Sequence, residues 1–269
     1  MEIVEYRGIE GLVAAEVLTD DAEDGYTTDD VFQIAGVAEI SRTTDSSQEA
    51  HYYDNIPAVV VSNTSSDTVT ITTSAIPLDV VGKITGQVYD GTTGALIEGL
   101  RQVKYFAIGY KAKKTNGDEM YVWRYKGTFN IPDQTNTTEN DSTDANGQEL
   151  VYTGIATTHK FTKTGKGEKA MVVDVAKNLA NVNSFFDVVT TPDTLEAKVA
   201  RTLSITQATD TVVTVTRGGV SLTSADPIYD GDILTISVTG GTITVNGSAF
   251  TSGNTLTVSA NVAVVSTKT

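Results

Sequence analysis

The stretch of residues 76–157 constrains the fold of this chain more than any other. It contains Asn116-Gly117. Both central positions of a tight type I′ turn need positive φ, which these two residues adopt readily. The flanking segments, Val103–Ala112 and Glu119–Lys126, alternate apolar and polar residues as strands do. The sequence therefore predicts a β-hairpin here.

A helix is predicted just before that hairpin. Leu78, Val81 and Ile84 follow Pro77 at helical spacing, and proline is favoured in the first turn of a helix. The pattern predicts a helix of about three turns, which should end in the Gly-rich segment 91–94. No other segment of the chain has so clear a helical pattern, and Val182–Phe186 suggests only a weaker helix.

The segments after the hairpin are mostly strands and polar turns. Phe129–Ile131 should continue the sheet, and Leu150–Phe161 predicts a further strand. Gln134–Glu149 predicts a polar loop, and Lys163–Lys169 predicts a lysine-rich turn.

The N-terminal segments mostly have strand character. Val4–Glu16 and Val31–Arg42 each predict a strand. The polar segment Thr43–Asn55 has no periodicity, which suggests an extended loop or the arm of a hairpin. Ala58–Ser62 and Thr68–Thr73 are rich in β-branched residues and flank an Asn/Ser/Asp turn, so they predict a second hairpin.

The composition changes near the C-terminus. Leu203–Thr269 consists of short apolar segments separated by Gly-Gly, Asp-Gly and Asn-Gly turns, which is the pattern of a small antiparallel β-sandwich. We therefore expect two domains, residues 1–195 and 196–269. The fold class is mainly β: a sandwich- or barrel-like core with one flanking helix, followed by a smaller sandwich of immunoglobulin-like architecture.

The formal net charge is −15, and its distribution is uneven. Residues 1–100 carry 3 basic and 18 acidic side chains, residues 101–200 carry 13 and 12, and residues 201–269 carry 3 and 4. An acidic surface argues against sequence-specific nucleic-acid binding, which needs Lys and Arg to neutralise phosphates. The simplest explanation of the acidity is solubility.

The sequence contains no recognisable motif for catalysis, metal binding or phosphate binding. The chain has no cysteine, and its two histidines, His51 and His159, are far apart and lie in no zinc-binding motif. The glycines around Lys166 do not fit a phosphate-binding loop, and the acidic segment 20–31 departs twice from a calcium-binding loop. We therefore expect no enzymatic activity, no metal and no cofactor.

Neither a signal peptide nor a membrane span is expected. The first residues, MEIVEYRGIEG, have no basic region followed by an apolar one. No apolar run approaches the roughly 18 residues that a membrane helix needs. The expected location of synthesis is the cytoplasm, without membrane insertion.

The predicted hairpin has two unlike faces. Tyr121, Trp123 and Tyr125 alternate with Val122, Arg124 and Lys126, so one face is aromatic and the other largely basic. Such aromatic residues could stack on bases, but they more often pack a sheet or an interface. An exposed basic hairpin in a chain with an acidic N-terminal third suggests association between copies.

The order of several segments resembles a known family. YRGIEGLVAAEVLTDD, AEISRTTDSSQEAHYYDN, IPLDVVGKITGQVYD and GYKAKKTNGDEMYVWRYKGTFNIP succeed one another over roughly residues 1–190. In this order they resemble the major tail tube proteins of long-tailed, non-contractile phages. No single motif carries the resemblance, which rests on the succession, above all on Lys126-Gly127-Thr128-Phe129 and Pro132.

The resemblance implies a structural virion protein made in the host cytoplasm. Six copies would form a ring whose inner sheets join into one barrel. The rings would stack into a tube around a tape-measure protein, with tail terminator and tail-tip proteins at the ends. DNA would later pass through an acidic lumen. The C-terminal sandwich resembles the outward decorations of some tail tubes, and removing it after Asp193 should leave the tube able to form.

Contacts between copies are expected on two polar segments, Thr43–Asn55 and the hairpin Lys111–Arg124. The candidate interface residues on these segments are Asp45, Glu49, His51, Tyr53, Lys111, Lys113, Lys114 and Arg124. The alternative function is a non-catalytic β-rich surface module or carbohydrate-binding module. A surface module should carry a secretion signal or an anchor, and none is recognised in the sequence.

Overall fold

The computed structural model describes residues 3–53, 56–135 and 147–268. The chain forms two compact units. The first unit comprises Met1–Lys177 and Val182–Leu195, and the second comprises Asn178–Asn181 and Glu196–Thr269. The short segment Asn178–Asn181 therefore leaves the first unit and joins the second, so the boundary between the units is crossed three times.

The first unit is mainly β, with one α-helix and one 3₁₀ helix among its described residues. Its elements are β1 (Tyr6–Asp20), β2 (Tyr26–Thr28), β3 (Phe32–Gln33), β4 (Val37–Tyr53), β5 (Ile56–Thr73), α1 (Leu78–Thr85), β6 (Val88–Asp90), β7 (Ala95–Ile97), β8 (Phe106–Lys114), β9 (Glu119–Phe129), β10 (Asp133–Gln134), β11 (Gln148–Ile155), β12 (Ala170–Asp174) and the 3₁₀ helix η1 (Val175–Lys177).

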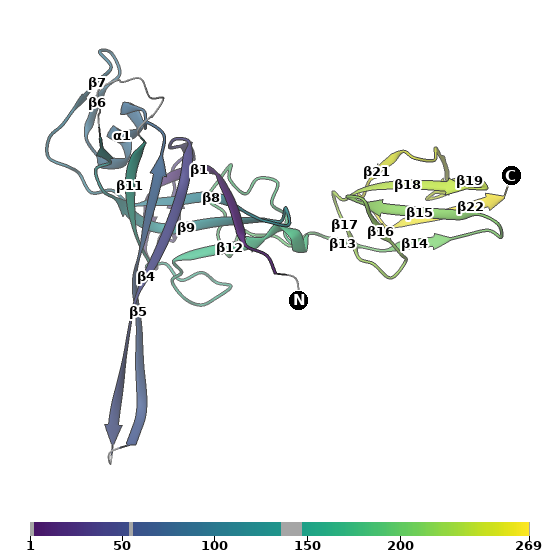
Figure 1. Ribbon diagram of the computed structural model, residues 1–269, viewed down its shortest axis with the longest axis horizontal. Coiled ribbons are helices and arrows are strands. Elements are labelled where there is room, and N and C mark those ends of the chain that lie inside the picture. Colours follow the sequence, from purple (N-terminus) through teal and green to yellow (C-terminus); the bar gives the residue numbers. More distant parts are fainter. Residues whose placement is uncertain (1–2, 54–55, 136–146, 269) are drawn as a thin grey trace. The chain divides into compact units, whose positions relative to one another are not determined.

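A single sheet organises this unit. Its strands lie in the order β2-β1-β8-β9-β11-β5-β4, while β3 pairs with β1, β10 with β11 and β12 with β9 (Figure 1). All of these pairs are antiparallel. The helix α1 and the separate β6–β7 hairpin lie beside one end of the sheet. The expectation of a mainly β fold with one flanking helix is confirmed.

The two faces of β9 pack against different groups. Val122 on one face belongs to the main apolar core, together with Phe106 and Tyr152. The other face carries large aromatic side chains. Trp123 and Tyr125 of β9 are fully buried. The Trp123 indole N–H donates to the carbonyl oxygen of Phe185 at 2.8 Å, and the Tyr125 hydroxyl donates to that of Thr190 at 3.3 Å. The polar tips of these rings are thereby satisfied, as buried tyrosine and tryptophan require. The segment Val182–Phe186, for which a helix was suggested, forms turns that cover these rings.

Two glycines make room for aromatic rings, Gly109 for Trp123 and Gly127 for Tyr152. Gly109 lies opposite Trp123 in the β8–β9 ladder, and a Cβ there would come within 3.0 Å of the indole. A Cβ at Gly127 would lie 2.3 Å from the ring of Tyr152 and 2.5 Å from a backbone oxygen. The Lys-Gly-Thr-Phe segment therefore needs glycine at position 127 because a strand and an aromatic ring approach it closely.

The helix is shorter than predicted. It ends at Thr85 because Gly86 takes a left-handed conformation, with φ of 70°. A Cβ at position 86 would lie 2.2 Å from the carbonyl oxygen of Gln102. Glycine at the residue after the last turn is a common helix stop. The glycines at 91 and 94, where the end was expected, instead belong to the turn between β6 and β7.

The predicted hairpin around Asn116-Gly117 is confirmed as β8–β9, but its predicted type I′ turn is wrong. Gly117 has φ of 90°, whereas φ is not positive at Asn116. The other predicted hairpin is wrong. Ala58–Ser62 and Thr68–Thr73 belong to one continuous strand, β5, whose partner is β4. The polar residues between them form no turn because the ladder to β4 continues through them, with one irregularity at Thr44/Ser46. Of the two possibilities for Thr43–Asn55, the hairpin arm is correct for residues 43–53, and residues 54–55 lie outside the described part.

The ends of several other predicted strands also differ from those in the structure. The segment Val31–Arg42 is split into β3 and the start of β4, with Gly36 between them. The strand expected over Leu150–Phe161 ends at Ile155. The strand expected to continue over Phe129–Ile131 ends at Phe129. In the polar segment 134–149, residues 136–146 lie outside the described part.

The second unit is a sandwich of two four-stranded sheets, β14-β22-β19-β20 and β16-β15-β18-β21, with a small β13–β17 pair. Its strands are β13 (Ala200–Arg201), β14 (Leu203–Thr206), β15 (Val212–Arg217), β16 (Val220–Leu222), β17 (Ile228–Tyr229), β18 (Ile233–Thr239), β19 (Gly241–Val245), β20 (Ser248–Phe250), β21 (Thr255–Thr257) and β22 (Val262–Lys268). Side chains of both sheets form one apolar core. The pairing is antiparallel as predicted except between β14 and β22, which are parallel.

The buried carboxylate of Asp232 links the segment Asn178–Asn181 to the rest of the second unit. Asp232 is 5% exposed and binds Arg217 at 2.7 Å. Its other oxygen accepts a hydrogen bond from the Asn178 side chain at 2.8 Å and lies 3.7 Å from Lys198. Asn178–Asn181 is held to this unit through these contacts and through its backbone bonds to residues 196–198.

Candidate assembly surfaces

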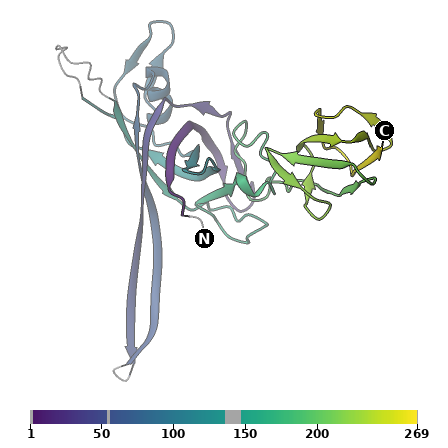
Figure 2. The same ribbon diagram turned by 45° about the vertical axis from the view of Figure 1, so that its right-hand side comes forward.

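The longest surface feature of the first unit is a two-stranded arm, residues 45–66, formed by the distal parts of β4 and β5. The β4–β5 ladder runs from Val37–Thr73 to Tyr53–Ile56. The other neighbour of β5, strand β11, pairs only with Asp67–Thr73. The arm therefore leaves the sheet and pairs only with itself, as both views show (Figures 1 and 2).

The arm exposes both polar and apolar side chains. Asp45, Glu49 and His51 are exposed on β4. On β5, Ile56 is 65% and Val59 50% exposed. An isolated two-stranded ribbon is marginally stable in water, and exposed apolar side chains add to its tendency to bind another surface. The arm therefore has the character of a contact element.

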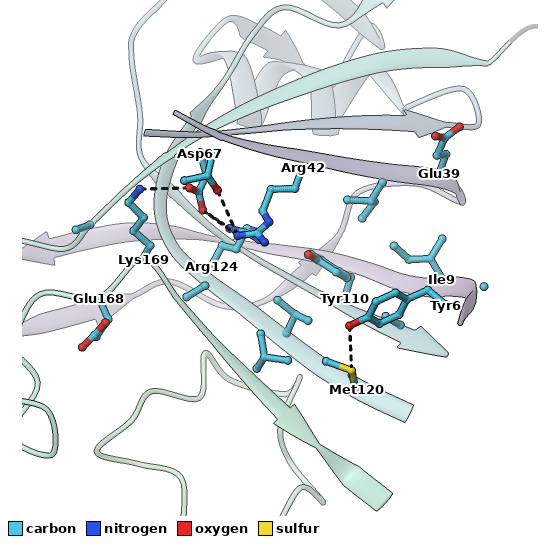
Figure 3. Close-up of a pocket in the computed structure, with 18 of the residues that line it drawn as sticks. Tyr6, Ile9, Glu39, Arg42, Asp67, Tyr110, Met120, Arg124, Glu168 and Lys169 are labelled. Atoms are coloured by element: carbon cyan, nitrogen blue, oxygen red, sulfur yellow. Dashed lines mark hydrogen bonds and ion pairs between the residues drawn. The ribbon is translucent and has the colours of Figure 1, made fainter. Parts of the chain in front are cut away.

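A group of charged residues, here called the root cluster, fixes the arm where it leaves the sheet. It consists of Asp67 and three cations, Arg42, Arg124 and Lys169. The Asp67 carboxylate is 4% exposed and lies 2.7 Å from Arg124, 3.2 Å from Lys169 and 3.8 Å from Arg42. Arg124 comes from β9, Arg42 from β4 and Lys169 from the segment before β12, so one carboxylate joins three parts of the sheet (Figure 3).

The Lys169 ammonium group also bonds to the carbonyl oxygen of Ser65, the second residue before Asp67. The last residues of the arm are thus held by side chain and backbone together. Burial would raise the pKa of Asp67, but hydrogen bonds from Thr44 and Lys169 and the charges of Lys169 and Arg124 outweigh it and lower the pKa below the usual value of 3.8. The carboxylate therefore stays ionised at neutral pH.

A hollow of about 950 Å³ lies beside the root cluster. Its wall is mainly apolar, and the root cluster forms one end (Figure 3). The apolar and aromatic residues that line it are Tyr6, Ile9, Ile40, Tyr110, Met120, Val122 and Val172. Arg124, whose side chain is 6% exposed, has a buried Nε that lacks a hydrogen-bond partner.

The sequence matches the family model described as phage tail tube protein over residues 11–184. The match covers more than half of the chain and runs from within β1 past the end of β12. The chain belongs to the phage tail tube proteins. The tail tube protein is thus a structural component of the virion that assembles with other tail components into a tube. A comparison with curated proteins finds no match. Apart from Asn178–Asn181, the second unit lies outside the matched residues.

The tail tube protein does not present its β8–β9 hairpin as a freely basic surface. Lys113 pairs with Glu10 at 3.0 Å and Glu119 at 3.6 Å, and Lys114 lies 3.5 Å from Asp174. Lys111 lies over the ring of Tyr121 at 5.3 Å. These cations are neutralised or covered within one copy, so the expectation of an exposed basic hairpin is wrong. Whether the hairpin also contacts another copy stays a prediction.

Arg124 is the clearest departure from the predicted interface. The sequence placed it on an exposed basic face, but its side chain is buried in the root cluster. The structure instead brings Asp45, Glu49 and His51 together on the arm, where all three are exposed. The side chain of Tyr53 lies outside the described part.

Sequence reasoning missed Asp67 and Lys169. Asp67 was assigned to a turn, and Lys169 to a lysine-rich turn. They are separated by 102 residues, so no local pattern connects them. An acidic residue at the edge of a Thr-rich alternating strand was the only available signal, and it does not identify a partner.

Across residues 3–53, 56–135 and 147–268, no group of three or more His, Asp or Glu side chains could hold a metal ion. None of the helices in those ranges is long and apolar enough to cross a membrane.

The root cluster predicts a strong effect of Asp67→Asn. The change leaves Arg124 and Lys169 without their counter-charge in a buried site, and breaking a buried ion pair costs about 3–5 kcal/mol. Urea unfolding at pH 7 should show a loss of that size. Asp45→Asn is the control, because the same chemical change there affects an exposed side chain with one 3.4 Å bond from Ser66. Equal midpoints for the two variants would contradict the role of the cluster.

The lowered pKa of Asp67 predicts how that difference depends on pH. A carboxylate whose folded pKa lies below its unfolded value of 3.8 stabilises the fold above that value. The contribution is lost as the pH falls from 3.8 through the folded pKa. The gap in unfolding free energy between wild type and Asp67→Asn should therefore be full at pH 7 and shrink below pH 3.8. A gap that grows on acidification would contradict this assignment.

Proposed function

We propose that this tail tube protein forms hexameric rings that stack into the conduit for phage DNA, and that the arm makes the contact between successive rings. The observation that carries this proposal is the arm itself, a long exposed ribbon on a unit that matches the tail tube family. At about 3.3 Å per residue, the nine residues 45–53 of β4 reach roughly 30 Å from the root. That reach is comparable with the width of a small domain.

The open sheet supports a closed ring. The strand order leaves β2 at one end and β4 at the other. Exposed edge strands pair readily with other chains, and closing a sheet into a barrel removes the edges. A ring of identical subunits needs heterologous contacts that close by rotation. Edge pairing between neighbouring copies would meet both requirements.

The acidity of the N-terminal third supports a conduit function. Residues 1–100 hold 18 acidic and 3 basic side chains. A lumen lined by such residues would repel DNA phosphates, so DNA would pass without binding. The proposed partners are copies of the chain, a tape-measure protein in the lumen, and terminator and tip proteins at the two ends. The proposed role is structural and non-catalytic.

We propose separate roles for the two parts of the chain. Residues 1–195 would build the tube, and residues 196–269 would form an outward decoration with immunoglobulin-like architecture. Two findings support the division: the two compact units meet at Leu195–Glu196, and the family match ends at residue 184. Asn178–Asn181 is an exception, because this segment packs with the second unit.

Shortening the arm tests the proposed function. Residues 46–64 are replaced by Asn-Gly, a two-residue turn that suits a hairpin. Negative-stain electron microscopy of the purified wild type should show tubes with sixfold end views. The shortened variant should give single rings or free subunits, because the ring-to-ring contact is gone.

The control shortens a different hairpin, replacing the β6–β7 turn, residues 91–94, by Asn-Gly, and it should still form tubes. Tubes of wild-type length from the armless variant would exclude the arm as the contact. A wild type that light scattering shows as a 28.5 kDa monomer at every concentration would contradict the ring proposal itself.

A further inference from the structure

We infer that the hollow beside the root cluster is the receptor for the arm of a second copy, with Glu49 of that arm bound by the root cluster. This inference rests on the proposed ring-to-ring role of the arm and names its binding site. The occupant is a second copy of this chain. The argument uses charge, surface chemistry and the direction of the contact.

The root cluster has more positive than negative charge. Arg42, Arg124 and Lys169 contribute three cations around the single carboxylate of Asp67. The other two carboxylates that line the hollow belong to Glu39, which is exposed, and Glu168, which is partly exposed. Water screens those two, and also Arg42, whose side chain is 52% exposed, far more than it screens Arg124, Lys169 and Asp67. The buried groups are thus two cations and one carboxylate. The buried end of the hollow therefore favours one further carboxylate.

Arg124 also has unused hydrogen-bonding capacity at this position. Its Nη1 donates to Asp67, while its Nε is buried without a partner. A buried donor without an acceptor is costly and rare in folded proteins. Arginine presents several donors in a fixed planar fork that suits carboxylates. Because this Nε is shielded from the hollow, an incoming carboxylate would supply the acceptor that it lacks only with a small shift of the guanidinium.

The arm offers a matching group of side chains. Glu49 and His51 are two residues apart on β4, so they share a face of the ribbon, and Val59 lies opposite His51 in the ladder. All three side chains are exposed. One face of the arm thus presents a carboxylate next to an apolar side chain. The hollow presents the complement, a cationic end next to the apolar wall of Ile9, Tyr110 and Val122.

A contact between the arm of one copy and the hollow of the next has the direction that a stack of rings needs. The hollow lies at the root of the arm, since Arg42, Thr44 and Asp67 line it. A contact between the distal arm of one copy and the root of the next is heterologous. Heterologous contacts close into a ring or propagate as an open stack, depending on the rotation between copies. Placed between successive rings, this contact would leave a free arm at one end of the stack and a free hollow at the other. One pair of surfaces would add ring after ring in the same direction.

Cysteine cross-linking tests this inference, because the natural chain has no cysteine. His51→Cys on the arm is combined with Ala38→Cys or with Ala156→Cys, both exposed alanines that line the hollow. After mild oxidation of assembled tubes, denaturing gels should show a ladder of covalent oligomers for at least one of the pairs. The control pair joins His51→Cys with Ala95→Cys, an exposed alanine outside the hollow, and should give no ladder.

Charge reversal provides the second readout. Glu49→Arg places a cation against the root cluster, and like charges across an interface are strongly unfavourable. The yield of tubes should fall about tenfold or more. Glu98→Arg makes the same change at another exposed site and should leave the yield within about twofold of the wild type. Both variants keep the root cluster intact, so a fall in stability is not expected for either.

The outcomes separate this inference from the proposed function. Tubes without a hollow-specific ladder, or with equal ladders for all pairs, would overturn the inference and leave the ring-and-tube proposal standing. Equal yields for Glu49→Arg and Glu98→Arg would also overturn it. If wild-type protein forms neither rings nor tubes, the proposed function fails and this inference fails with it.

Discussion

The ion pairs of the buried Asp67 carboxylate are the interactions on which the rest of the first unit depends. Three cations from three segments converge on it at the point where β5 leaves the sheet. A free two-stranded ribbon is marginally stable, so an arm of this length needs a rigid base. The root cluster supplies that base, and the Lys169 bond to Ser65 extends it to the last residues of the arm.

The same cluster connects the arm with the hydrophobic core. Arg124 lies on β9 between Trp123 and Tyr125, whose rings are fully buried. Alternation along the strand directs the rings to one side and the guanidinium to the other. One strand thus holds the rings of Trp123 and Tyr125 on one face. Its other face carries both Arg124, at the base of the arm, and Val122, which belongs to the main apolar core. A change in either is expected to affect the other through this strand.

Much of the fold could be predicted because local signals agreed with the tertiary structure. Asn116-Gly117 predicted the β8–β9 hairpin. The helix was predicted from Pro77 and from the helical spacing of Leu78, Val81 and Ile84. The helix end was misplaced because several glycines followed. The deciding fact was the close approach of Gln102 to Gly86, which is a tertiary contact.

The arm and its root were harder to predict from the sequence. The polar residues 63–67 suggested a turn, since strands with one buried face rarely contain such a run. This part of β5 lies where the arm leaves the sheet, and its register is set by pairing with β4 rather than by burial. Arg124 looked exposed because its partner Asp67 is 57 residues away. Charge pairing at such separations leaves no periodic signal.

Hydrogen exchange of the arm amides tests the central claim most directly, namely that a ribbon held at its root becomes buried when copies assemble. Exchange is followed by mass spectrometry in free subunits and in purified tubes, over residues 45–53 and 56–66. The account predicts that these amides exchange much more slowly in tubes than in subunits, while the amides of β14 to β22 in the second unit change little. Arm amides that exchange at the same rate in both states would contradict it.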